Sequence, residues 1–298
     1  WLADPRVRAL PEDGRTFVAH GRDTYDVISV EVGQTFRPGV ESFYTREFYA
    51  LARRRLRDGG LIAQFVPLSF LDEISLRRIV ATFLEAMPHG ALWYNTSELL
   101  LVGGDRLALD PGRLARAVTD ADLAADLAFS PWGGDEFALS RPGVLLGGFL
   151  CGERGLAALA GGASVLRDDH PVLAYATAGA REEDLREVPL AALLARHAEP
   201  VAEYLAAPAD PAVLATAARV QALNLDDLAS AAHRRLGEAR RAAGDLPAAI
   251  AQLREALDLN PQSAEVLRLL GDAYLEAGRA DVAARLLADA VSRRPDDA

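Results

Sequence analysis

The stretch Tyr25-Asp26-Val27-Ile28-Ser29-Val30-Glu31 decides the fold, because it is an apolar strand pattern that ends on a carboxylate. The turn Asp13-Gly14-Arg15 precedes it, and Tyr44-Thr45-Arg46-Glu47-Phe48-Tyr49 follows it as the start of a predicted helix. Strands and helices that alternate in this way predict a doubly wound α/β sheet, entered midway, with ligands beyond the carboxyl ends of the strands. Asp13 and Glu31 occupy two such ends.

The remaining elements are predicted from hydrophobic periodicity and from turn residues. Strands are expected at 7–10, 25–31, 61–66 and 172–178, helices at 44–57 and 71–87, and a closing hairpin at 91–95 and 99–103. Pro171 limits helix formation at the start of 172–178, which favours a strand there. The α/β domain is expected to cover 1–180, followed by a linker over 181–195.

Composition narrows the function classes. The net charge of −11 argues against nucleic acid as a partner and is compatible with a cationic ligand. All 32 basic residues are arginine, which excludes a lysine-dependent phosphate loop and a lysine Schiff base. The single cysteine, Cys151, adjoins the apolar run 144–150 and is predicted to be core, and the five histidines show no metal-ligand spacing.

No apolar run reaches the length of about 20 residues that crosses a bilayer. The chain starts at Trp1 rather than at Met. We therefore expect a cytoplasmic chain that continues upstream, with a membrane domain before Trp1 as one option.

The last third of the chain repeats itself. Four pairs of identical residues are each separated by 34 positions, namely Gly237 and Gly271, Gly244 and Gly278, Ala256 and Ala290, and Pro261 and Pro295. This separation is the tetratricopeptide period. It predicts clear repeats at 230–263 and 264–297 and a degenerate repeat at 196–229. Repeat arrays of this kind bind protein partners on a concave face.

Five motifs in order carry a family resemblance: the three stretches quoted first, Gly59-Gly60-Leu61-Ile62-Ala63-Gln64, and Asp168-Asp169-His170-Pro171-Val172-Leu173. Over about residues 1–104 the chain resembles the spermidine synthase family, the polyamine aminopropyltransferases. The last motif resembles a segment of bacterial members that are fused to membrane domains. The resemblance implies a Rossmann-like sheet with decarboxylated S-adenosylmethionine as co-substrate, a small diamine as acceptor, and neither a metal nor a permanently bound cofactor.

The resemblance also assigns roles to residues. Asp13 matches the carboxylate that accepts a hydrogen bond from the adenine amino group, and Gly14 allows close backbone approach. Glu31 falls where the family places the aspartate that holds and deprotonates the attacking amine. Gln34 matches a second family acid and can orient an amine without neutralising it. Gln64 matches a polyamine contact, and Tyr94, with Trp93, can wall the amine pocket.

The family's glycine-rich loop and ribose-binding acid would precede Trp1. Without them, we expect the chain alone to bind such a nucleotide poorly.

Each of these residues also has a structural interpretation. Asp13 can cap the helix that begins at Arg15, and Glu31 can be an ordinary strand-end carboxylate. Trp93 and Tyr94 can pack a hairpin, and Asp168 with Asp169 can be solvated turn acids.

Three hypotheses follow. The first is an aminopropyltransferase, the second a non-catalytic scaffold that holds a partner through its repeats, and the third a methyltransferase dependent on S-adenosylmethionine.

Overall fold

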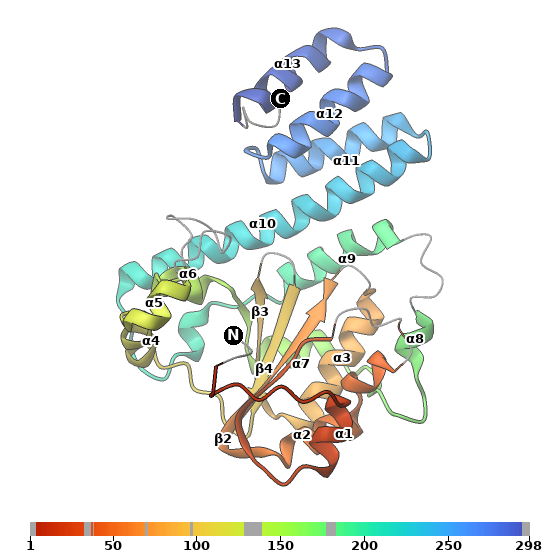
Figure 1. Cartoon of the computed structure of the whole chain (residues 1–298). Coiled ribbons are helices and arrows are strands. Elements are labelled where there is room, and N and C mark those ends of the chain that lie inside the picture. The colour runs from red at the N-terminus through yellow and green to blue at the C-terminus, as the bar shows by residue number, and fades with distance from the viewer. Residues whose placement is uncertain are drawn as a thin grey trace.

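The computed structural model describes residues 4–32, 37, 39–68, 71–95, 98–127, 139–176 and 183–293. A sheet with its helices forms the first part of the chain, and a helical array rises from it toward the C-terminus (Figure 1). No helix in the described ranges combines the length and the apolar character that a bilayer span requires.

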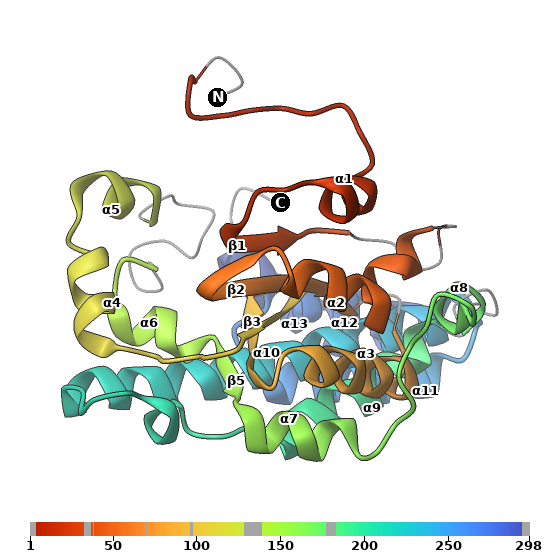
Figure 2. The ribbon, with the colours of Figure 1, turned by 90° about the horizontal axis from the view of Figure 1, so that it is seen from below.

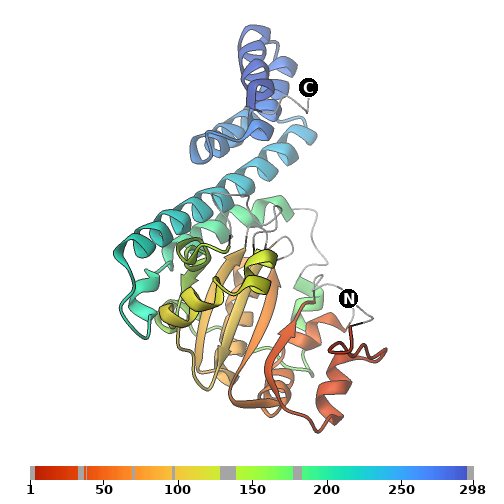
Figure 3. The ribbon, with the colours of Figure 1, turned by 60° about the vertical axis from the view of Figure 1, so that its left-hand side comes forward.

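Five strands form one mixed sheet: β1 (Tyr25–Val30), β2 (Leu56–Pro67), β3 (His89–Asn95), β4 (Glu98–Gly104) and β5 (Phe149–Cys151). Their order is β1-β2-β4-β3-β5, with β1 parallel to β2 and the other pairs antiparallel. Because Pro67 pairs with Glu98, the carboxyl ends of β1 and β2 share an edge with the β3–β4 turn (Figure 3). We call this edge the carboxyl rim; it comprises Glu31, Val32, Pro67, Leu68 and Glu98.

One face of the sheet is covered by α2 (Arg46–Arg53), α3 (Glu73–Ala86) and α7 (Glu153–Ala160), which lie on the same side in Figure 2. Alternate residues of β2 face these helices, and Ile62, Gln64 and Val66 are fully buried. On the opposite face, Val27 of β1 remains 59% exposed. The main core therefore lies on the side of α2 and α3.

Short helices complete the first part: α1 (Gly14–His20), the 3₁₀ helix η1 (Val40–Tyr44), α4 (Pro111–Ala117), α5 (Ala121–Leu127) and α6 (Pro142–Gly147). The strands predicted around 25–31 and 61–66 and the hairpin at 91–95 and 99–103 are confirmed. Cys151 is buried at the end of β5, as predicted. The helix predicted over 44–57 is shorter, because Thr45 caps α2 and the chain turns into β2 after Arg54.

Two strand predictions are wrong. Residues 172–176 form a helix, α8 (Val172–Ala176). Pro171 directly precedes its first residue, where the missing N–H of proline costs no helical hydrogen bond. The stretch 7–10 is irregular, and Val7 is 39% and Leu10 is 36% exposed. It pairs with no strand among the described residues.

The repeat region contains α10 (Pro211–Ala242), α11 (Leu246–Leu259), α12 (Ala264–Glu276) and α13 (Ala280–Arg293). A Cβ on Gly237 would lie 2.7 Å from Leu253, and one on Gly271 would lie 2.8 Å from Leu287, so glycine is required where each helix pair approaches. Gly244 turns the chain between α10 and α11 with a φ of +80°.

Helices also occupy the region before the clear repeats. Most of the predicted linker 181–195 belongs to α9 (Glu183–Arg196), and α10 runs for 32 residues through the predicted boundary at 229/230. The predicted degenerate repeat 196–229 consists of the 3₁₀ helix η4 (Val201–Tyr204) and the first half of α10. Leu190 and Leu228 join the core of the sheet, so α9 and α10 lie across the carboxyl rim (Figures 1 and 3).

Candidate functional site at the carboxyl rim

Glu31 lies at the rim, directly after the last residue of β1, and is exposed. No hydrogen bond or ion pair engages its carboxylate within the described part of the chain. A carboxylate without a protein partner at the carboxyl end of a strand is available to a ligand. Gln34, the other predicted amine contact of this loop, lies outside the described residues.

A buried polar cluster lies beneath Glu31. The Tyr44 hydroxyl lies 2.9 Å from the carbonyl oxygen of Val32 and 3.0 Å from that of Phe65. The Gln64 amide nitrogen lies 3.0 Å from the same Phe65 oxygen and 3.5 Å from that of Val30, while its oxygen lies 3.4 Å from the Tyr49 hydroxyl. Gln64 is fully buried. The structure therefore places it below the rim surface, with both ends of its amide engaged by the protein.

Asp13 caps α1. Its carboxylate accepts a hydrogen bond of 2.7 Å from the Thr16 N–H, and this bond lowers the pKa of Asp13 below its ordinary value. α1 runs back toward the start of β1, so its N-terminus, with Asp13 and Gly14, lies toward the end of β1 where Glu31 is found (Figure 2). A Cβ on Gly14 would meet Phe43 at 3.9 Å, so this position is not crowded.

Asp168 makes long-range contacts that sequence reasoning did not predict. Its carboxylate accepts hydrogen bonds of 2.9 Å from Arg15 and 2.7 Å from the Thr45 hydroxyl. Partial burial raises the pKa of Asp168, but the hydrogen bonds from Arg15 and Thr45 outweigh it and hold the pKa below its ordinary value. Asp168 thus ties the start of α1 to the start of α2, and its side chain stays 40% exposed in a turn, as the structural interpretation expects.

Of the two aromatic residues predicted to line the amine pocket, Tyr94 is buried and Trp93 is partly buried. Tyr94 is 5% exposed, and burial raises the pKa of its hydroxyl, an effect that the charge of Asp227 on α10 reinforces and that of Arg235 opposes. Trp93 packs edge-on against Phe149 with ring centroids 5.6 Å apart. Both residues pack against neighbouring elements, and α10 covers the side of the rim where Tyr94 lies.

Two further acids lie on η1 and at the start of β4. One carboxylate oxygen of Glu41, in η1, is buried and has no hydrogen-bond partner among the described residues. Glu98 begins β4 at the rim, close enough for its charge to add to the effect of burial that raises the pKa of Tyr44. Glu31 and Glu98 thus give the rim two acidic side chains, and acidic side chains favour a cationic ligand.

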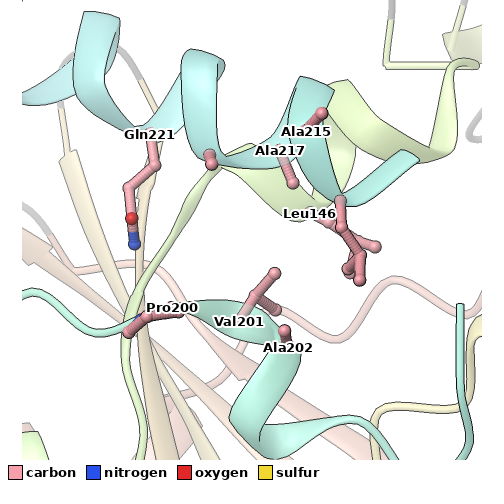
Figure 4. A pocket seen from close by; sticks show the side chains of 9 residues that line it. Leu146, Pro200, Val201, Ala202, Ala215, Ala217 and Gln221 are labelled. Carbon is pink, nitrogen blue, oxygen red and sulfur yellow. The ribbon is translucent and has the colours of Figure 1, made fainter. Parts of the chain in front are cut away.

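The apolar pocket of 370 Å³ in Figure 4 lies elsewhere, between α6, η4 and α10. Leu146, Val201 and Leu214 line it, and the Gln221 amide nitrogen at its edge donates to the carbonyl oxygens of Phe149 and Glu199. It contains no charged side chain. The candidate site is therefore the rim, where the acids are.

The mixed sheet, with the carboxylate of Glu31 at the end of the parallel strand β1, and the paired helices that follow it define an α/β domain joined to a helical repeat array. Asp13 does not end a strand, contrary to the prediction, because residues 7–10 form none. A family model described as a tetratricopeptide repeat matches residues 237–278. The chain is similar to polyamine aminopropyltransferase 2 of Pseudomonas aeruginosa, with 41% identity over 72 residues, which cover 24% of this chain and 21% of that protein.

Two further relatives are named polyamine aminopropyltransferase. That of Korarchaeum cryptofilum is 28% identical over 89 residues, 30% of this chain and 27% of the relative. That of Nitrosomonas europaea is 29% identical over 101 residues, 30% of this chain and 31% of the relative. The chain thus spans between 21% and 31% of the length of these three relatives. The expected resemblance is confirmed: the chain is spermidine synthase-like in part and carries tetratricopeptide repeats.

Proposed function

We propose that this chain belongs to a polyamine aminopropyltransferase, which transfers an aminopropyl group from decarboxylated S-adenosylmethionine to a diamine. The observation that carries the proposal is the exposed carboxylate of Glu31 at the end of β1, which no other group in the described part of the chain engages, on a rim that also carries Glu98. The matches to polyamine aminopropyltransferases over part of the chain support it.

Glu31 would hold the diamine and accept its proton. An alkylammonium with a pKa of about 10.4 is not a nucleophile until it loses that proton, so a nearby carboxylate must orient it and help to remove it. The freed nitrogen lone pair attacks the methylene carbon beside the sulfonium and forms a C–N bond. The C–S bond breaks, its electron pair neutralises the sulfonium as methylthioadenosine, and the remaining proton leaves through Glu31 to water.

The other proposed contacts divide between the two substrates. We assign Asp13 and Gly14 to the adenine, at the N-terminus of α1, and Gln34 to the amine. Gln64 and Tyr94 belong to the amine side but are buried, so we expect them to act on the shape of the site from beneath its surface.

The test uses the full-length protein with decarboxylated S-adenosylmethionine and a series of diamines, and it measures release of methylthioadenosine. Loss of general base catalysis in Glu31→Gln should slow turnover by about a hundredfold or more. Glu203→Gln, a matched change in a half-exposed side chain of η4, should keep wild-type turnover. Absence of product with every diamine, or full activity in Glu31→Gln, would contradict the proposal.

The repeat match supports a second candidate, a scaffold that binds a protein partner. Because α10 shares the core of the sheet, this is tested with the whole chain. A scaffold should capture the same partner with wild type and with Glu31→Gln, and should release no methylthioadenosine. The methyltransferase alternative predicts a methylated amine when S-adenosylmethionine is the donor.

A further inference from the structure

The backbone on both sides of Glu31 is held from within the protein. The carbonyl oxygen of Val32, which follows Glu31, is 2.9 Å from the Tyr44 hydroxyl. The carbonyl oxygen of Val30, which precedes it, is 3.5 Å from the Gln64 amide nitrogen, a weak contact by its length. Tyr44 therefore makes the stronger of the two contacts that flank Glu31.

Tyr44 also reaches the neighbouring strand. Its hydroxyl oxygen is 3.0 Å from the carbonyl oxygen of Phe65, near the end of β2. A hydroxyl has a single proton, so Tyr44 shares that proton between one oxygen beyond β1 and one of β2. Burial raises the pKa of Tyr44, and the nearby charge of Glu98 raises it further, so the hydroxyl keeps this proton throughout the physiological pH range.

The position of Tyr44 is itself fixed. The side chain is fully buried and ends η1, directly before the N-cap Thr45 of α2. The Thr45 hydroxyl donates to Asp168, which also accepts from Arg15. The backbone at Tyr44 is thus held through Thr45 and Asp168, which connect α1, α2 and the loop before α8. From this fixed position the Tyr44 side chain reaches the carboxyl ends of β1 and β2.

We propose that Tyr44 is a positioning residue for Glu31, holding the backbone just beyond β1 so that an exposed carboxylate keeps a fixed place at the rim. The role given to Glu31 rests on the proposed function; the tether itself rests on geometry alone. Since no described side chain holds the Glu31 carboxylate, the position of this carboxylate depends on the backbone that carries it. Catalytic groups need support of this kind, because displacements of about 1 Å can cost a hundredfold in rate.

The direct test compares Tyr44→Phe with Tyr25→Phe in the full chain. Tyr25 lies at the opposite end of β1, and no hydrogen bond of its hydroxyl is found within the described residues. In wild type and Tyr25→Phe, we expect backbone amide order parameters at Glu31 and Val32 near the rigid value of about 0.85. In Tyr44→Phe they should fall below about 0.6, while those in the middle of β2 stay unchanged. Unchanged values at Glu31 and Val32 would overturn the inference.

Two further measurements separate this inference from the proposed function. If the full-length enzyme is active, Tyr44→Phe should lower kcat by about tenfold and change KM for the amine by less than about twofold, because misplacement affects reaction more than binding. Unchanged kcat would overturn the positioning role. If the enzyme is inactive with every amine, the proposed function fails, and the order parameters still decide the tether.

Should Tyr44→Phe fail to fold, the wild-type chain remains testable. The hydroxyl proton of a fully buried side chain, held between two carbonyl oxygens, should exchange slowly with water and give its own NMR signal. A Tyr44 hydroxyl proton that exchanges freely would overturn the inference.

Discussion

Two glutamates of this chain show opposite environments. Glu31 is exposed at the carboxyl rim, and no side chain or N–H of the described chain engages its carboxylate. Glu199 is 7% exposed, and its carboxylate accepts from the Gly152 N–H at 3.1 Å, the Gly155 N–H at 3.0 Å and Arg154 at 2.6 Å. The Tyr204 hydroxyl adds a fourth donor at 2.5 Å. A carboxylate whose lone pairs the protein has already used holds the fold, whereas a free one at a strand end can hold a ligand.

The environment of Glu199 has a clear structural purpose. α7 begins after Gly152, which has no side chain to cap the helix. Glu199, which follows α9 in sequence, supplies the missing acceptor for the first N–H groups of α7, where the helix dipole also favours negative charge. This contact fastens η4 and the start of α10 to β5 and α7. The comparison predicts that mutations at Glu199 act on stability and mutations at Glu31 act on chemistry.

Removal of the Glu199 carboxylate should have the largest effect on stability. Glu199→Ala leaves two buried N–H groups and the Tyr204 hydroxyl without an acceptor, and we expect a loss of about 3 kcal/mol in the free energy of unfolding. Glu203→Ala is the matched control, because Glu203 pairs with the same Arg154 but its side chain is 48% exposed. That change should cost less than about 1 kcal/mol. Equal losses in chemical denaturation would contradict the contrast between buried and exposed acids.

A methyl group beside the same cluster should have the next largest effect. A Cβ on Gly152 would lie 2.1 Å from the Tyr204 ring, so Gly152→Ala must displace the ring or the helix start. We expect a loss of about 2 kcal/mol from overpacking. Gly112→Ala is the control, since its Cβ would meet an exposed Asp110 oxygen at 3.2 Å, and it should change stability by less than about 0.5 kcal/mol. Denaturation midpoints that do not differ would show that the glycine is not required for close approach.

The Glu199 cluster should also make stability depend on pH in acid. Desolvation raises the pKa of Glu199, but the hydrogen bonds from Tyr204, Gly152, Arg154 and Gly155 outweigh it and lower the pKa below its ordinary value of 4.5. A folded-state pKa below the unfolded value gives stability that is complete above pH 4.5 and is lost as the pH falls through the folded-state pKa.

The acid dependence of Glu199→Gln should therefore be shallower than that of the wild type. Thermal unfolding of both between pH 3 and pH 7, a range chosen to bracket the ordinary carboxyl pKa of about 4.3, measures it. Parallel curves would show that the carboxylate is not held by these donors.

The smallest effect on stability is expected at the rim. Glu31→Gln removes a charge that contacts no described group, and we expect the free energy of unfolding to change by less than about 0.5 kcal/mol. The same denaturation experiment measures it. A loss comparable to that of Glu199→Ala would show that Glu31 is structural, and would remove the basis for assigning it to catalysis.

The sequence predicts the sheet well where local pattern and topology agree. The strand 25–31, the strand 61–66 and the hairpin each carry continuous apolar runs between turn residues, and all three form. The hydrophobic pattern is a poor guide where a strand forms only if a neighbouring strand pairs with it. The stretch 7–10 has the composition of a strand but pairs with none in the described chain, and Pro171 starts a helix as readily as it limits one.

The site is predictable only in part, for a physical reason. Glu31 can be placed at a strand end from its neighbours alone, because strand ends are local features. The contacts that support it are not local: Arg15 and Asp168 are 153 residues apart in sequence, and Tyr44 meets Phe65 across 21. Whether an acid is held or free depends on such pairs, and this is why the contacts of Asp168 with Arg15 and Thr45 cannot be predicted from its turn alone. Gln34 and the domain boundaries stay predictions.

The central claim is that Glu31 is an available carboxylate and Glu199 an occupied one, and a ¹³C NMR titration of both carboxyl groups tests it most directly. The full-length protein, labelled at the glutamate carboxyl carbons, is titrated with a diamine in the presence of methylthioadenosine, and Glu31→Gln and Glu199→Gln assign the two signals. The account predicts that the diamine shifts the Glu31 signal while the Glu199 signal stays in place. A Glu31 signal that does not respond to any diamine would contradict it.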